Sequence, residues 1–365
     1  MLNLPKPFVT LIFVLVEYPS AMDADRHSPN APEIGADSLT VSAIVLRELR
    51  GQLAAWHQHE PGARLGSDPE ALHQLRVAVR RIEAMLSVFR RQLSPALTRA
   101  RSATKGVLRT LGTVRDFDVQ LAQLDARCTR LGAKDRAAAL PLRQRLEQER
   151  ERARSQLLRA LDAEPVRQWL ATLEQATTDG AGVGPETAVS VVPARVRRRF
   201  RKLKRAVQTI NGRSTMERFH TVRRRAKQLR YALECAATLC GKPSASMLKA
   251  LRALQDELGA HQDAEMAARR LTQLAARAEG LPARTLFLMG RLVEHDLVDT
   301  AAARKTLERG WRKVRKRWRP LRARLQALAA PAEPTAPLAP EPDPPAVPPS
   351  DDSFGELTPL QAVRH

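Results

Sequence analysis

An internal repeat constrains this chain of 365 residues more than any other feature of its sequence. Residues 70–118 resemble residues 217–265 at a constant offset of 147 positions, with no gap along the whole stretch. The matched pairs are Glu70 and Glu217, His73 and His220, Arg76 and Arg223, Arg80 and Lys227, Leu86 and Leu233, Leu111-Gly112 and Leu258-Gly259, Asp116 and Asp263, and Asp118 and Glu265. Such regularity predicts two copies of one unit, related by a pseudo-twofold axis.

The repeated unit has a helical pattern. Apolar residues recur at a spacing of three to four, and alanine, leucine and arginine, all strong helix formers, dominate the chain. Aromatic residues make up only 4%, and the β-branched and aromatic runs of an all-β fold are missing. The predicted fold is all-α, with helices near 40–58, 69–92, 95–112, 116–131, 134–162 and 164–177, then near 190–210, 214–240, 243–259, 262–279, 282–299 and 301–328.

The repeat and the breaker residues predict how the chain is divided. A helical domain spans 39–328, with a first repeat at 39–178 and a second at 186–328, separated by a Gly-rich break at 179–185. Residues 329–365 form a predicted disordered tail, because nine prolines crowd into 331–349.

Residues 1–38 are predicted to be a disordered extension of the helical domain. The apolar run Phe8–Val16 is too short to span a membrane. We interpret this run either as the core of a signal-like segment or as a stretch upstream of a true start at Met22.

Charge points to a polyanionic partner. The net charge is +22, and 55 basic and 26 acidic residues fall between 68 and 328, so the central segment would bind the anion.

The three cysteines lack paired CxxC spacing, which excludes a disulfide framework and argues against a zinc site. The expected compartment is the reducing cytoplasm, and no cofactor or metal is predicted.

The cations of the repeat share one helix face in each copy. Positions i, i+3 and i+7 of a helix lie within about 60° of one another. His73, Arg76 and Arg80 therefore form a first stripe, and His220, Arg223 and Lys227 form a second stripe. Arg81, Arg224 and Arg230 widen these stripes. The opposite faces are apolar and are predicted to pack inward: Leu72, Val79, Ile82, Leu86 and Phe89, and Phe219, Val222, Leu229 and Leu233.

Both copies continue with Leu-Gly and, four residues after the glycine, an aspartate. A glycine that ends one helix and an aspartate that caps the next would explain Gly112 with Asp116 and Gly259 with Asp263. Alternatively, Asp116 could hold an arginine of the stripe. A metal pair of Asp116 and Asp118 is rejected, because the sequence clusters no further ligands beside them.

These motifs resemble the CHAD (conserved histidine α-helical domain) family. The resemblance rests on HxxRVxxRR at 73–81, LGxxRDxDV at 111–119, HxxRxxxKxxRYxxE at 220–234 and LQxxLGxxxD at 254–263. It covers about residues 40–328. It implies two pseudo-symmetric antiparallel helical bundles around a central basic cavity that binds inorganic polyphosphate. In some members it also implies association with polyphosphate granules.

The resemblance also implies which residues contact the ligand. These polyphosphate-binding positions are His73, Arg76, Arg80, Arg81, Lys105, Arg115, His220, Arg223, Lys227, Arg230 and Arg252. Tyr231 is expected to pack beside them. Glu83 departs from the family pattern, which usually has an arginine there, so the first copy would be the weaker anchor.

Two other functions remain open from the residues. Eight basic residues in 195–205 and eleven in 304–324 would suit weak nucleic-acid binding, although no DNA-reading motif is present and Trp311 and Trp318 are predicted to face the core. Phosphoryl chemistry on His73 or His220 is less favoured, because such enzymes use carboxylate-held magnesium. We therefore predict a non-enzymatic polyphosphate-binding protein, cytoplasmic and associated with granules, without a membrane partner.

If several phosphates are contacted at once, affinity for polyphosphate is expected to fall steeply with rising salt, because bound counterions are released. Arg223→Ala should reduce the slope of log affinity against log salt by about one. Arg26→Ala, in the N-terminal segment, should leave the slope unchanged. Titrations at three or more salt concentrations measure it, and a salt-insensitive affinity would contradict multi-phosphate binding.

Overall fold

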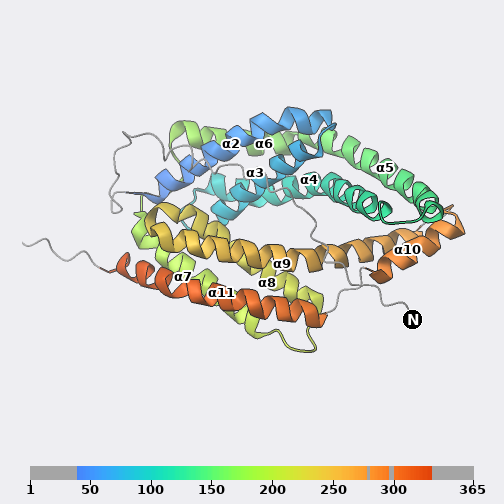
Figure 1. Ribbon diagram of the computed structural model, residues 1–365. Coiled ribbons are helices and arrows are strands. Elements are labelled where there is room, and N and C mark those ends of the chain that lie inside the picture. The colour runs from blue at the N-terminus through green and yellow to red at the C-terminus, as the bar shows by residue number, and fades with distance from the viewer. Residues whose placement is uncertain (1–38, 278–279, 296–299, 331–365) are drawn as a thin grey trace, which may run out of the picture. The chain divides into compact units, whose positions relative to one another are not determined.

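Helices make up almost all of the computed structural model, which describes residues 39–277, 280–295 and 300–330 (Figure 1). Within these residues the only β-type pairings are two isolated bridges, Thr40 with Thr187 and Leu93 with Val183. The helices are α2 Val41–Leu65, α3 Pro69–Val88, α4 Pro95–Cys128, α5 Ala133–Leu161, α6 Glu164–Asp179, α7 Ala188–Gln208, α8 Met216–Cys235, α9 Ala237–Arg277, α10 Ala283–His295 and α11 Thr300–Ala327. The all-α prediction is confirmed.

Local sequence signals set several helix starts. The Asp68 carboxylate accepts a hydrogen bond from the Glu70 amide at 2.8 Å, and Pro69 follows as the first residue of α3. Ser94 and Pro95 begin α4 in the same way, with the Leu97 amide donating to the Ser94 hydroxyl. A side-chain acceptor followed by proline is a favourable helix start, because proline has no amide proton to leave unpaired.

Two predicted helix breaks are wrong. The chain was expected to break near 112–116 and again near 259–262, but α4 and α9 each continue through the Leu-Gly dipeptide and the following aspartate. Asp116 and Asp263 therefore cap no helix. The chain deviates instead at Gly241 near the start of α9, where φ is 53°, a left-handed conformation that glycine adopts without strain.

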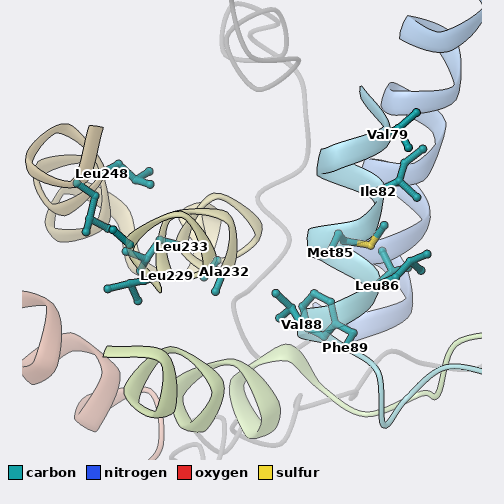
Figure 2. Close-up of a cluster of buried hydrophobic side chains, with 14 of the residues drawn as sticks. Val79, Ile82, Met85, Leu86, Val88, Phe89, Leu229, Ala232, Leu233 and Leu248 are labelled. Carbon is teal, nitrogen blue, oxygen red and sulfur yellow. The ribbon is translucent and has the colours of Figure 1, made fainter. Parts of the chain in front are cut away.

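One main hydrophobic core joins α3 and α8 to their neighbours. The apolar faces predicted for these two helices are all buried, as expected. Figure 2 shows part of this cluster, with Ile82, Met85 and Phe89 of α3 and Leu229 and Leu233 of α8 among its side chains. The helix α3 contacts α2, α4 and α8, while α8 contacts α3, α7 and α9. A smaller core lies where α5 and α10 meet.

Aromatic contacts fix the outer helices. Phe200 of α7 stacks on Trp318 of α11, with ring centroids 3.8 Å apart, and also lies 5.8 Å from Trp311. Both tryptophans pack against the main core, as the sequence predicted. On the other side, Trp56 of α2 meets Trp169 of α6 edge to face at 5.3 Å.

The starts of equivalent helices follow the offset of the sequence repeat. Val41 and Ala188 begin α2 and α7, and Pro69 and Met216 begin α3 and α8, each pair 147 residues apart. The later helices differ, because α5 is one helix of 29 residues whereas the matching stretch is divided between α10 and α11.

All described residues up to 329 belong to one compact unit. The predicted extension at 1–38, and residues 331–365 of the predicted tail, lie outside the described residues. None of the helices in the described residues is both long enough and apolar enough to cross a membrane.

A buried polar contact joins α6 to α4 and gives a stability test. The indole Nε1 of Trp169 donates to the Thr104 hydroxyl at 3.0 Å, and both residues are buried. Thr104→Val keeps the shape but leaves the indole N–H without an acceptor, which should lower the free energy of unfolding by about 1–3 kcal/mol. Thr113→Val, the same change at an exposed site of α4, should alter it by less than about 0.5 kcal/mol in the same denaturant titration.

Candidate anion-binding site

The two stripes lie on two helices that contact each other. The first stripe is on α3 and the second on α8, and these helices contact each other and both contribute apolar side chains to the main core. Most of the stripe side chains are half-buried, with His220 exposed. The structure thus brings cations from the two sequence repeats into one region.

An arginine of each stripe lies against the backbone of the following helix. Arg76 Nη1 donates to the Leu108 carbonyl oxygen of α4 at 3.2 Å. Arg223 Nε donates to the Gln255 carbonyl oxygen of α9 at 3.3 Å, and its Nη1 donates to Gln262 Oε1 at 3.1 Å. The two carbonyl contacts are the same interaction at the same offset of 147 residues. Each arginine is thereby held in place while donors remain for a ligand.

The Leu-Gly dipeptide makes these arginine contacts possible. A Cβ atom on Gly112 would lie 2.8 Å from Arg76 Nη1, and one on Gly259 would lie 2.9 Å from Arg223 Nη2. At either distance a Cβ atom fits only if the guanidinium shifts from its place. The repeated glycine therefore serves close approach of a guanidinium to a continuous helix, and the predicted role as a helix end is wrong.

The repeated aspartates lie beside the stripes and face Arg270 of α9. Asp116 forms an ion pair with Arg270 at 2.6 Å, and its negative charge opposes the lowering of the Arg76 pKa. Burial raises the pKa of Asp263, while the charges of Arg223, Lys227 and Arg270 oppose that shift. Asp116 thus pairs with an arginine outside the stripes and acts on the stripe only through space. Asp118, which was rejected as a metal ligand, pairs with Arg150 at 2.6 Å.

Arg80 connects the electrostatics of the two stripes. Burial, followed by the charges of Arg223, Arg80 and Arg230, lowers the pKa of Lys227 to about 7. Burial and then Arg80 lower the pKa of Arg76 to about 10. One first-stripe cation thus acts on both copies. Like charges are held together in a partly dry region, where a bound anion would relieve their repulsion.

His73 shares this cationic environment. Burial lowers its pKa, and the positive charge of Arg115 lowers it further, with smaller contributions from Arg76 and Arg80. The structure therefore brings Arg115 of α4 to the first stripe, as the family resemblance implied. A histidine with a lowered pKa is neutral at pH 7 and can donate one N–H to a phosphate oxygen.

The other implied ligand residues are spread more widely. Arg230 lies over the Tyr231 ring at 4.8 Å, which confirms the expected packing, and Arg230 and Arg252 lie 3.8 and 3.6 Å from Glu234. The charge of Arg81 opposes the raised pKa of the half-buried Glu48 of α2. Lys105 is exposed on α4, and no described contact joins it to the stripes.

Sequence reasoning missed Arg270. Its positive charge lowers the pKa of Arg76 in the first copy and also lowers that of Asp263 in the second, so Arg270 lies near both copies. The repeat gave no signal for it, because the position 147 residues earlier is Gln123.

A cavity of about 630 Å³ lies between α4, α5 and α9. Asp116 and Arg270 are in its wall, together with Gln120, Gln144 and Gln148, and none of the stripe cations lines it. Among the described residues, no group of three or more His, Cys, Asp or Glu side chains could hold a metal ion.

The fold is all-helical, and its two neighbouring cationic helices form a candidate anion-binding site. The family model described as the CHAD domain matches residues 47–272, more than half of the sequence. The chain therefore belongs to the CHAD domain family, as its four motifs predicted.

Solved structures agree with this assignment. The crystal structure of the CHAD domain from the plant Ricinus communis is 26% identical, covers 77% of this chain and 97% of its own, and gives a TM-score of 0.62. PptA from Streptomyces chartreusis is 21% identical, covers 77% of this chain and 99% of its own, and gives a TM-score of 0.54, a likeness of fold alone. No curated protein matches the chain.

A substitution at Gly259 is expected to affect the stability of the fold and the affinity for a ligand in different ways. Gly259→Ala should keep or raise the free energy of unfolding, by up to about 1 kcal/mol, because alanine favours a helix and a flexible guanidinium can move aside. The displaced Arg223 would lose its carbonyl contact, so affinity for a phosphate polyanion should fall about three- to tenfold.

Gly106→Ala is the matched control for this substitution. It lies within α4 with no atom within 4 Å of the added Cβ, so it should gain similar stability and leave affinity unchanged. Equal affinities for the two variants, measured by calorimetry at fixed salt, would mean that the position of Arg223 does not matter for binding.

Proposed function

We propose that this protein binds inorganic polyphosphate along the first and second stripes. The observation that supports the proposal is that the positive charge of Arg80 lowers the pKa of both Arg223 and Lys227. The cations of α3 and α8 therefore form one positively charged region. The family resemblance supports polyphosphate as the anion. A single extended chain could contact both helices.

The donor chemistry suits phosphate oxygens. Arginine offers a planar set of N–H donors that pairs with two oxygens at once and stays charged at all relevant pH values. Since Arg76 and Arg223 are already held by helix carbonyls, less side-chain freedom is lost when a ligand binds.

We propose binding without catalysis. His73 lies among cations and Asp116 is engaged with Arg270, and within the described residues no group of three or more His, Cys, Asp or Glu side chains could hold magnesium against a phosphate. In the cell this activity would place the protein in the cytoplasm at polyphosphate granules, or as a scaffold on polyphosphate. Release of orthophosphate from polyphosphate in the presence of magnesium, measured over hours, would contradict a purely binding role.

Nucleic-acid binding is the second candidate function, and a basic surface on α11 supports it. Arg312, Arg315, Lys316 and Arg319 line a hollow of about 420 Å³ on this helix. Such a surface neutralises a phosphate backbone without reading bases. Competition of polyphosphate against RNA and DNA at physiological salt decides between the two candidates.

Chain length gives the sharpest test of the two-stripe site. The cations of each stripe extend over about 10 Å of helix, so one stripe contacts only a few phosphates. A longer chain can reach the second stripe intramolecularly, which raises its avidity. Long polyphosphate should therefore bind at least about tenfold more tightly per phosphate than tripolyphosphate or ATP.

Breaking either stripe should remove most of this length preference. The pairs are Arg76→Ala with Arg80→Ala and Arg223→Ala with Lys227→Ala, and the second pair should have the larger effect because Glu83 weakens the first half. Lys134→Ala with Arg159→Ala removes two exposed cations of α5 as a control. Calorimetry over a series of chain lengths measures the preference, and equal affinity per phosphate at all lengths would leave only a general basic surface.

The lowered pKa of Lys227 predicts pH-dependent binding. Free Lys227 loses its proton above about pH 7, whereas a bound anion favours the charged ammonium, so binding takes up a proton. The affinity for long polyphosphate should fall as pH rises from 7 to 9, by up to about tenfold per pH unit. The charged groups that act on Lys227 are Arg80, Arg223, Arg230, Asp256 and Asp263.

Lys227→Arg keeps the charge and should flatten this dependence, since arginine stays protonated through pH 9. Calorimetry in buffers of different ionisation enthalpy reports the proton uptake directly. The same uptake in wild type and in Lys227→Arg would assign the titration to another group.

A further inference from the structure

A second group of cations lies on α7, outside the two stripes. Arg195, Arg198, Arg199 and Lys202 occupy positions i, i+3, i+4 and i+7 of this helix and so share one face. The sequence repeat does not account for them. The positions 147 residues earlier are Glu48, Gly51, Gln52 and Ala55, so only the second half of the chain carries this basic face.

Arginines that follow α3 join this face. Burial lowers the pKa of Arg195, and the charges of Arg91, Arg90 and Arg198 lower it further. Arg199 has a pKa lowered to about 10, by burial and then by Arg195, with Arg198 and Arg90 adding to the effect. We call Arg90, Arg91, Arg195, Arg198, Arg199 and Lys202 the α7 cluster. It is assembled from two separate parts of the chain.

The α7 cluster is not neutralised by acids. Within the described residues no ion pair joins any of its six members to a carboxylate, and Arg195 contacts only the amide oxygen of Gln92, at 3.4 Å. At the stripes, by contrast, Asp116 and Asp263 act on the cations. Arg195 and Arg199 are half-buried and the other four members are exposed, so the electrostatic cost that a bound anion would offset is largest at these two arginines.

Two glutamates separate the α7 cluster from the stripes. Burial raises the pKa of Glu48. The charges of Glu48 and Glu234 raise the pKa of the Cys235 thiol, and the charge of Arg199 lowers it. Glu234 in turn pairs with Arg230 and Arg252 on the stripe side. Negative charge between two positive regions favours two separate sites over one continuous track.

We propose that the α7 cluster is a second phosphate-chain site, distinct from the stripes, through which one protein molecule engages a second polyphosphate chain. The inference rests on the proposed function for the identity of the ligand. A phosphate chain fits better than nucleic acid, because Phe200, the aromatic residue of α7, is turned inward onto Trp318 and offers no ring for base stacking. Two sites on one protein allow polyphosphate to cross-link protein molecules.

The test removes two exposed cations of the cluster. Arg198→Ser with Lys202→Ser leaves the half-buried arginines in place, and circular dichroism with thermal unfolding confirms that the variant folds. Calorimetry with tripolyphosphate should show one fewer bound ligand than in wild type. With long polyphosphate the variant should still bind, while light scattering from cross-linked assemblies should drop by about tenfold or more. Lys134→Ser with Arg159→Ser, the same charge change on α5, should match wild type in both measurements.

The outcomes distinguish this inference from the proposed function. Unchanged stoichiometry and scattering in the α7 variant would overturn the second site and leave the stripes untouched. Loss of all binding in the α7 variant, with none lost in Arg223→Ala and Lys227→Ala, would reject the stripes and support the α7 cluster. If the α7 variant loses affinity for single-stranded RNA but not for tripolyphosphate, the surface is a nucleic-acid site and the inference fails.

Discussion

The site depends on the contact between a guanidinium and a helix backbone at a glycine. Arg76 and Arg223 reach the carbonyls of Leu108 and Gln255 because Gly112 and Gly259 have no side chain in the way. Their positive charges are then kept close to Arg80 and Lys227 in a region too dry to screen them. The apolar faces of α3 and α8 supply the stabilisation that holds these repelling groups together. The repulsion within this cationic region is thus maintained at the expense of fold stability, which is a common trade-off at functional sites.

The sequence was sufficient to predict the all-α fold and the helices that carry the stripes, but the breaks that it predicted near 112–116 and 259–262 are absent from α4 and α9. Apolar spacing placed the buried faces of α3 and α8, and the fixed offset identified His73, Arg76 and Arg80 with their counterparts. The role of the Leu-Gly dipeptide could not be predicted, because a glycine that ends a helix and a glycine that admits an arginine look alike in sequence. Asp116 was misjudged for the same reason, since its partner Arg270 lies 154 residues away. Contacts of that range leave no local pattern.

The two halves of the chain share their first helices and differ in the later ones. The correspondence of α2 with α7 and of α3 with α8 preserves the arginine contacts, whereas α5 has no single counterpart. The surface differs too, because α7 is strongly basic where α2 has Glu48, Gly51, Gln52 and Ala55. The helices that begin the two halves are therefore equivalent in position and different in surface charge.

Two pairs of residues at equivalent positions of the sequence repeat influence each other across the two halves of the chain. Arg80 acts on Lys227, its own counterpart at the offset of 147, and the Thr285 hydroxyl donates to the carbonyl oxygen of Ala138, again its counterpart, at 2.9 Å. In two units related by a twofold axis, equivalent residues face each other at the axis. A polyphosphate chain reads the same from either end, whereas a nucleic-acid strand has a 5′ and a 3′ direction. A chain crossing such an axis would meet the same arginine and the same glycine whichever end entered first, so this site would have no preferred polarity for its ligand.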